Sequence, residues 1–102
     1  MAKATLATDG TLMFWCPGCD EAHGVVIDGS RGWTWNGRLD SPTISPSVHA
    51  TGKRRRLAPD GSKEWYEYCC HSFVKDGHIQ FLADCTHALA GKTVPLPDWE
   101  DV

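Results

Sequence analysis

Hydrophobic and polar residues alternate over short stretches of the chain, and Asp-Gly, Asn-Gly and Pro-Gly pairs separate these stretches at short intervals. Such pairs favour tight turns, and the stretches between them are strand-length and rich in β-branched and aromatic residues. The pattern is therefore typical of a small antiparallel β-domain. The predicted strands cover residues 11–15, 24–27, 32–35, 45–51, 64–74 and 78–82.

Helix is scarce in this pattern. Only "THALA", residues 86–90, has the composition of a helical turn, which Gly91 would end. Two prolines in the tail that follows keep it extended. Because a chain of 102 residues builds one core and not two, we expect a single mainly β domain over residues 1–102. Residues 1–10 and 98–102 are expected to be loose ends.

The charge is that of an ordinary soluble protein and names no partner, since the net charge is −3 with 23% charged residues. The basic run "GKRRR" is predicted to be a solvated hairpin tip between Thr51 and Glu64. Because no aromatic residues are interleaved with it, we expect no nucleic-acid partner. No apolar run approaches the roughly 20 residues that cross a bilayer, and the first residues lack a signal-peptide layout. We therefore expect a cytoplasmic protein without membrane contact.

The cysteines indicate a metal site. Five cysteines cannot all pair as disulfides, so cysteines near histidines are better candidates for metal ligands. In "CPGC", Cys16 and Cys19 can direct two thiolates at one ion, and Gly18 is expected to supply the positive φ of the turn. Strand-like flanks disfavour the alternative, a thioredoxin-like redox pair, which needs a strand followed by a helix. Zinc is the leading cofactor, with His23 a nearby competitor for a ligand position.

A second segment, "CCHSFVKDGHIQFLADCTH" at residues 69–87, holds three of the five cysteines and three of the five histidines. If Asp76 and Gly77 are the central residues of a two-residue turn, the segment is a hairpin with a defined register. Side chains of each strand then alternate between two faces. The cysteine and histidine chemistry of the segment is thereby divided between these faces.

The first face of this hairpin supplies candidate metal ligands. Cys70 and Cys85 are diagonal neighbours there, within reach of an ion that the first two cysteines also hold, and a downstream histidine could replace one of them. A turn one residue longer would place Cys69 in this position instead of Cys70. The candidate ligands are Cys16, Cys19, Cys70, Cys85 and His87.

The second face carries His71 and Asp84 as diagonal neighbours. A carboxylate beside an imidazole fixes its tautomer and raises its basicity, which a general base needs. A structural hydrogen bond is an alternative role for this pair, because the hairpin itself supplies no nucleophile. Candidate hydroxyls come from "DSPTISPSV", in which two prolines stiffen the chain around Thr43, Ser45 and Ser47.

Several separated blocks together resemble a family of small phage and prophage proteins often labelled ammonia monooxygenase. These blocks include "FWCPGC", "WTWNG", "SPTISPSV" and "DCTHALAG", and the likeness extends over residues 14–97. The label does not suit so short a chain without a membrane span or a copper cluster. The resemblance implies a protein that acts in the cytoplasm of a bacterial host cell.

The chain is also distantly similar to the peptidase of bacterial ubiquitin-like conjugation operons. The shared features are a cysteine knuckle, a "PS" followed by a β-branched residue, and a histidine six residues before a hairpin glycine. They fall at Cys16 and Cys19, at Ser47, and at His71 with Gly77. The resemblance implies a serine-type peptidase in which Ser47 attacks the substrate and His71 takes its proton.

Three hypotheses follow. The first is a hydrolase that cleaves a protein or ubiquitin-like tail with Ser47, His71 and Asp84 as nucleophile, base and orienting carboxylate, with a structural zinc. The second is a hydrolase whose zinc is catalytic and keeps one position open for water. The third is a zinc-stabilised module without catalytic activity that binds a phage or host protein through its five tryptophans, of which Trp33 and Trp35 share one strand face.

Overall fold

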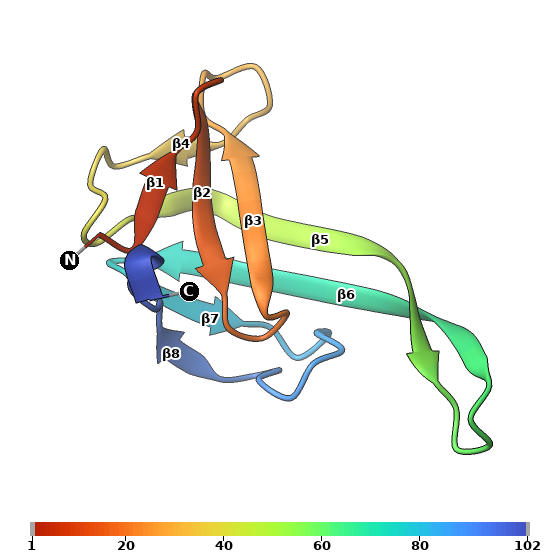
Figure 1. The fold of residues 1–102 in the computed structure, drawn as a ribbon. Coiled ribbons are helices and arrows are strands. Elements are labelled where there is room, and N and C mark those ends of the chain that lie inside the picture. The colour runs from red at the N-terminus through yellow and green to blue at the C-terminus, as the bar shows by residue number, and fades with distance from the viewer. Residues whose placement is uncertain (1, 102) are drawn as a thin grey trace.

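The structure is a computed structural model that describes residues 2–101. It is mainly β, with two antiparallel sheets and one short 3-10 turn, η1. The smaller sheet has the order β1-β2-β3 and crosses one face of the larger sheet, whose order is β4-β5-β6-β7-β8 (Figure 1). The prediction of a small antiparallel β fold is confirmed. The elements are β1 (Ala4–Leu6), β2 (Thr11–Cys16), β3 (Glu21–Val26), β4 (Thr34–Trp35), β5 (Ile44–Leu57), β6 (Lys63–Lys75), β7 (His78–Phe81), β8 (Thr93–Pro95) and η1 (Trp99–Asp101).

The core lies between the two sheets and is built by strand alternation. In β2, every second residue is buried, ending with Cys16, and β6 and β7 bury alternate residues in the same way. Both sheets therefore contribute one apolar face to a shared cluster, and their other faces are open to solvent. The main members of this cluster are Leu12, Phe14, Cys16, Val25, Ile44, Val48, Cys70, Val74, Ile79, Phe81 and Leu96.

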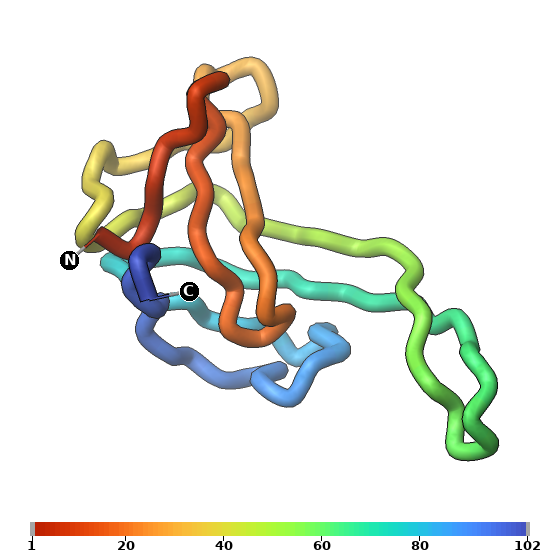
Figure 2. The backbone as a smooth tube through the Cα atoms, viewed as in Figure 1, coloured from red at the N-terminus to blue at the C-terminus, as the bar shows by residue number. Residues whose placement is uncertain are grey.

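The strands β5 and β6 continue beyond this body as a long two-stranded arm, residues 52–68, whose end points away from the smaller sheet (Figures 1 and 2). Their pairing runs without interruption from Val48 opposite Ser72 to Leu57 opposite Lys63. The basic run was expected to form a solvated hairpin tip, but in the structure it lies within β5. Its arginines stack on aromatic rings of β6 and help to keep the two strands paired. The stacked pairs are Arg54 on Tyr68, Arg55 on Trp65 and Arg56 on Tyr66.

Two further expectations differ from the structure. Residues 86–90 form turns instead of a helical turn, with the Ala90 amide donating to the His87 carbonyl. The N-terminal segment is not loose from Ala4 onward, because Ala4 is buried in β1 and the Lys3 amide donates to the Leu39 carbonyl. Lys3 Nζ also pairs with Asp98 at 3.0 Å, which ties the two ends of the chain together.

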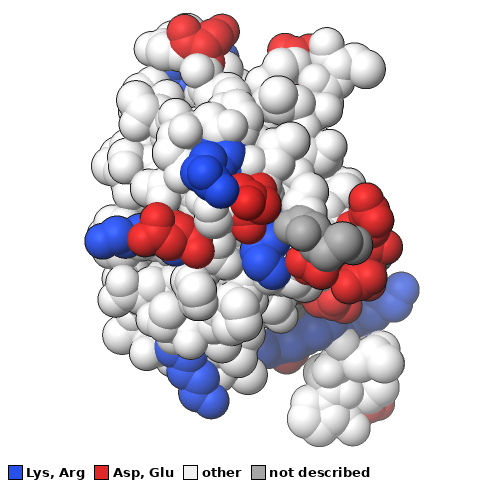
Figure 3. All heavy atoms as spheres, turned by 90° about the vertical axis from the view of Figure 1, so that its left-hand side faces the viewer, with Lys and Arg blue, Asp and Glu red and all other residues white. Residues whose placement is uncertain are grey.

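Charged side chains of both signs are interspersed with uncharged ones on the face that Figure 3 shows. This face therefore presents no extended field of one sign. No helix among the described residues is long and apolar enough to cross a membrane.

Candidate active site and metal centre

The hairpin of β6 and β7 sets the geometry of both candidate sites. Asp76 and Gly77 both have positive φ, 51° and 78°, as a two-residue hairpin turn of the I′ type requires. Lys75 pairs with His78 and Ser72 with Phe81, so the predicted register is confirmed. The side chains of successive β6 residues consequently point to opposite faces of the sheet, alternately toward the core and toward solvent.

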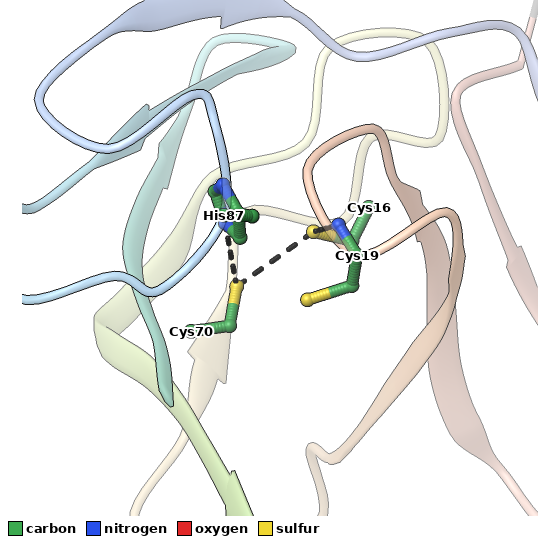
Figure 4. Close-up of side chains that lie close together, drawn as sticks. All are labelled: Cys16, Cys19, Cys70 and His87. Atoms are coloured by element: carbon green, nitrogen blue, oxygen red, sulfur yellow. Dashed lines mark hydrogen bonds between the residues drawn. The ribbon is translucent and has the colours of Figure 1, made fainter. Parts of the chain in front are cut away.

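On the core side, three cysteines and one histidine meet between the two sheets (Figure 4). Cys16 ends β2, Cys19 lies in the turn that follows, Cys70 comes from β6, and His87 from the loop after β7. The Cys16 and Cys70 Sγ atoms are 3.7 Å apart, and Cys70 Sγ is 3.5 Å from His87 Nε2. The four ligand atoms all lie within 4.8 Å of one another. The group could hold a metal ion.

The spacing of these atoms suits a tetrahedral ion. Zinc–sulfur bonds of about 2.3 Å give a tetrahedron whose sulfur atoms are roughly 3.8 Å apart, and a sulfur–nitrogen edge is roughly 3.5 Å. The observed 3.7 Å between Cys16 and Cys70 and 3.5 Å between Cys70 and His87 match these edges. His87 Nε2 faces the sulfur atoms, and the Leu89 amide nitrogen lies 3.2 Å from Nδ1 on the other side of the ring.

The thiols of this group influence one another's ionisation. The hydrogen bond with Cys70, with a smaller contribution from His23, lowers the pKa of Cys16 to about 4 despite its burial. Burial and the Cys16 charge raise the pKa of Cys19 to about 11. The hydrogen bond with Cys16 and burial also raise the pKa of Cys70. Without a cation, one thiol of the group ionises readily and the other two resist ionisation, and a bound cation would stabilise all three as thiolates.

Gly18 is needed for a reason that sequence analysis missed. Its φ is not among the positive values of the chain, and Asp20 adopts the left-handed conformation instead, with φ 55°. A Cβ at Gly18 would lie 2.3–2.6 Å from atoms of the His87 ring. The glycine therefore allows the imidazole to approach the cysteine turn closely.

Cys85, expected as a ligand, lies outside this group. Its Sγ is 3.2 Å from both the amide nitrogen and the carbonyl oxygen of His71. The prediction extended strand alternation past the end of β7, but the chain turns after Phe81, and the Cys85 amide donates to the Leu82 carbonyl. Cys85 thereby supports the backbone of His71. His87, and not Cys85, is the fourth member of the cysteine-rich group.

On the solvent side of the same sheet, the structure brings Ser47, His71 and Asp84 into one line of contacts. Ser47 Oγ is 3.2 Å from His71 Nε2, and His71 Nδ1 is 3.2 Å from Asp84 Oδ2. The side chains of His71 and Asp84 are 25% and 53% exposed. The imidazole is thus partly shielded, and Ser47 is half-buried.

An irregularity in β5 helps to place Ser47. Ile44 pairs with Val74, and Val48 pairs with Ser72. Between these two pairs β5 advances four residues while β6 advances two, which is a β-bulge in β5. Such bulges turn side chains away from their regular direction and are common beside active sites. The Trp33 indole donates to the Ser47 carbonyl at 2.9 Å and holds the bulge against the loop before β4.

His49 is a further neighbour of this line. Its ring is exposed, yet it stacks on the His71 ring with 4.5 Å between centroids. Its Nε2 lies 3.3 Å from Cys69 Sγ. His49 pairs with His71 across β5 and β6, and the bulge that sets this register gives no sequence signal.

Two hollows flank Ser47 along the strands. One, of about 530 Å³, is lined by residues that include Pro46, Phe73 and His78. The other, of about 500 Å³, includes Thr51 and Cys69 and borders the arm. Ser47 in β5 and His71 in β6 therefore lie between the linings of the two hollows, and neither lining includes them.

A serine hydroxyl, an imidazole and a carboxylate in line form the arrangement of serine hydrolases. Over residues 2–82, the sequence matches the family of the bacterial ubiquitination-like system serine protease (BubE), and the chain belongs to this family. The resemblance to the peptidase of such operons is thereby confirmed. The matched region includes Ser47 and His71 and ends before Asp84 and His87. Neither curated proteins nor solved structures give a match.

Proposed function

We propose that the protein is a serine peptidase with Ser47 as nucleophile, His71 as general base and Asp84 as orienting carboxylate. The observation that carries this proposal is the continuous contact from Ser47 Oγ through both nitrogens of His71 to Asp84 Oδ2. Membership of a serine protease family supports the reaction class. An isolated His–Asp pair would not support it, because the nucleophile must lie in hydrogen-bond reach of the base.

In this proposal, each residue of the line has one role in acyl transfer. His71 Nε2 accepts the proton of Ser47 Oγ as the oxygen attacks the substrate carbonyl carbon. The same nitrogen then donates that proton to the leaving amine, and a water molecule, activated by His71, hydrolyses the acyl-enzyme. Asp84 accepts a hydrogen bond from His71 Nδ1 and stabilises the imidazolium while it exists.

The metal in this proposal is zinc, and its role is structural. Three thiolates and one imidazole fill the four positions of a tetrahedral site, which leaves none open for a reactive water. The ion would join the cysteine turn to β6, the strand that presents His71 on its opposite face. This separation favours a structural zinc over the catalytic zinc of the second hypothesis.

The proposed substrate is a flexible tail of a protein. The site lies on an open sheet face, and its two hollows lie on either side of Ser47 along β5 and β6. An extended chain that runs along β5 can cover both hollows and pass Ser47. A ubiquitin-like protein with such a tail fits the family description, which names a ubiquitination-like system.

A serine-directed fluorophosphonate probe tests the proposal without a known substrate. We expect the probe to label Ser47, and peptide mass spectrometry should locate the adduct there. Labelling should disappear in both Ser47→Ala and His71→Ala, while each variant stays folded and retains its zinc. Ser45→Ala is the matched control, because Ser45 is an exposed serine in the same bulge, and it should be labelled normally.

Two outcomes would contradict the proposal. The first is a folded, zinc-loaded wild-type protein that the probe does not label. The second is loss of zinc in His71→Ala, which would make His71 a ligand. The first result would favour the non-catalytic binding module, and the second would favour either that module or the catalytic zinc.

A further inference from the structure

Four side chains that can bind a metal converge on the solvent side of the sheet, away from the cysteine-rich group. Ligand atoms of His49, His71 and Asp84 all lie within 4.8 Å of one another. Cys69 Sγ adds a fourth donor, 3.3 Å from His49 Nε2 and 3.9 Å from Asp84 Oδ2. Two of the four, His71 and Asp84, belong to the proposed catalytic line.

We propose that this cluster is a second, reversible site for zinc, and that zinc bound there inhibits the peptidase. This inference rests on the proposed function for its inhibitory effect, but the binding itself does not. His49, Cys69 and Asp84 would supply three protein ligands, with water or His71 Nδ1 in the fourth position.

The donor set selects the class of ion. An imidazole, a thiolate and a carboxylate suit zinc, whereas magnesium and calcium prefer oxygen ligands alone. In a tetrahedral zinc site, a sulfur ligand lies roughly 3.5 Å from a nitrogen or oxygen ligand. The 3.3 Å and 3.9 Å separations around Cys69 lie on either side of that value, so small rotations of the side chains would close the site. Cys69 would release its thiol proton to solvent as it binds.

Exposure makes this site weaker than the buried centre. His49 is exposed, and Asp84 is 53% exposed. Binding must order these side chains and displace their water, and only three protein ligands hold the ion. The second zinc should therefore exchange readily with free zinc in solution, while the ion between the sheets remains bound.

Inhibition follows from the shared atom Asp84 Oδ2. This oxygen faces His71 Nδ1 at 3.2 Å and also faces Cys69 Sγ. When zinc takes it, His71 loses the acceptor that orients its ring and stabilises its positive charge. A zinc ion that also binds Nδ1 would leave the ring proton on Nε2, so that Nε2 could no longer accept the proton of Ser47 Oγ. Both arrangements slow proton transfer from the hydroxyl.

Zinc titration of the purified protein tests the site. The protein should keep its tightly bound zinc and be freed of loose zinc by gel filtration before calorimetry with zinc chloride. We expect one further zinc per chain. Saturation should slow fluorophosphonate labelling on the order of 100-fold, the size of a general-base contribution. Magnesium chloride, the matched control salt, should change neither signal.

Three variants separate zinc binding at this site from its effect on labelling. His49→Phe keeps a ring to stack on His71 but removes a ligand, and Cys69→Ser removes the thiolate. Both should be labelled at a basal rate that zinc no longer lowers. Ser47→Ala should still bind the second zinc although it cannot be labelled, so binding is tested even where the peptidase proposal fails.

The outcomes that overturn the inference are specific. Absence of a second zinc in wild type and Ser47→Ala excludes the site. Equal zinc inhibition in wild type, His49→Phe and Cys69→Ser places the inhibitory ion elsewhere. An increase in labelling with zinc would give the exposed metal an activating role and exclude inhibition.

Discussion

Cys70 and His71 are consecutive residues of β6, and their side chains serve different sites on opposite faces of one sheet. Cys70 Sγ lies 3.5 Å from His87 Nε2, and His71 Nε2 lies 3.2 Å from Ser47 Oγ. Strand alternation alone produces this division. A displacement of β6 at this point moves both sites, so the stability of the cysteine-rich group bears directly on the proposed catalytic line.

Removal of the metal from the cysteine-rich group should destabilise the protein. An ion held by Cys16, Cys19, Cys70 and His87 would join the two sheets. A structural zinc contributes several kcal/mol to a small domain, and on the order of 10 kcal/mol in zinc-finger peptides. Thermal unfolding followed by circular dichroism, with and without a strong chelator, should show a large decrease in Tm. Identical melting curves for the metal-free and metal-loaded protein would contradict the structural role.

Cysteines inside and outside the buried group should respond differently to substitution by serine. Cys16→Ser and Cys19→Ser should lose metal or unfold, because each removes a thiolate from the buried group. Cys69→Ser and Cys85→Ser should retain the metal, because Cys69 faces solvent beside His49 and Cys85 bonds to backbone. Elemental analysis of the purified variants measures this contrast. If Cys85→Ser loses the metal, the ligand set must be revised to include it.

The hairpin of β6 and β7 could be predicted in detail from local signals. Asp76-Gly77 defines the turn, and the turn defines which face each residue of β6 occupies. That was sufficient to separate Cys70 from His71. The position of Cys85 could not be predicted in this way, because alternation holds only while the chain remains a strand, and β7 ends at Phe81.

Contacts between strands distant in sequence were beyond local signals. The stacking of His49 on His71 depends on the β5–β6 register, which shifts at the bulge before Val48. The arm could not be predicted from the basic run for the same reason, because the aromatic residues that stack on its arginines lie in β6 and not within the run itself. Residues 86–90 have helical composition, but the structure turns there and presents His87 to the cysteines. Tertiary contacts override weak local propensity in such a short segment.

Substitution of Gly18 should damage the metal centre although glycine is not a ligand. A Cβ at this position would overlap the His87 ring at 2.3–2.6 Å. Gly18→Ala should therefore weaken metal retention, measured as the rate of zinc transfer to a colorimetric chelator. Gly52→Ala is the matched control, since its Cβ would also meet an aromatic ring, that of Tyr68 at 2.8 Å, but in the arm. Equal rates in the two variants would show that the approach of His87 is not critical.

Asp84→Asn should leave the fold and the buried metal intact while it slows fluorophosphonate labelling. An asparagine can hold the ring of His71 but cannot stabilise its positive charge, and in serine proteases the equivalent loss is about 10⁴-fold. Because Asp84 is 53% exposed, water can replace part of its contribution, and we expect a smaller decrease, on the order of 100-fold. Residues that act as one unit lose activity non-additively, so adding Asp84→Asn to His71→Ala should decrease any residual labelling rate little further. If the loss in the double variant equals the product of the two single-variant losses, Asp84 and His71 act independently. The proposed contact between His71 and Asp84 would then have no role in proton transfer.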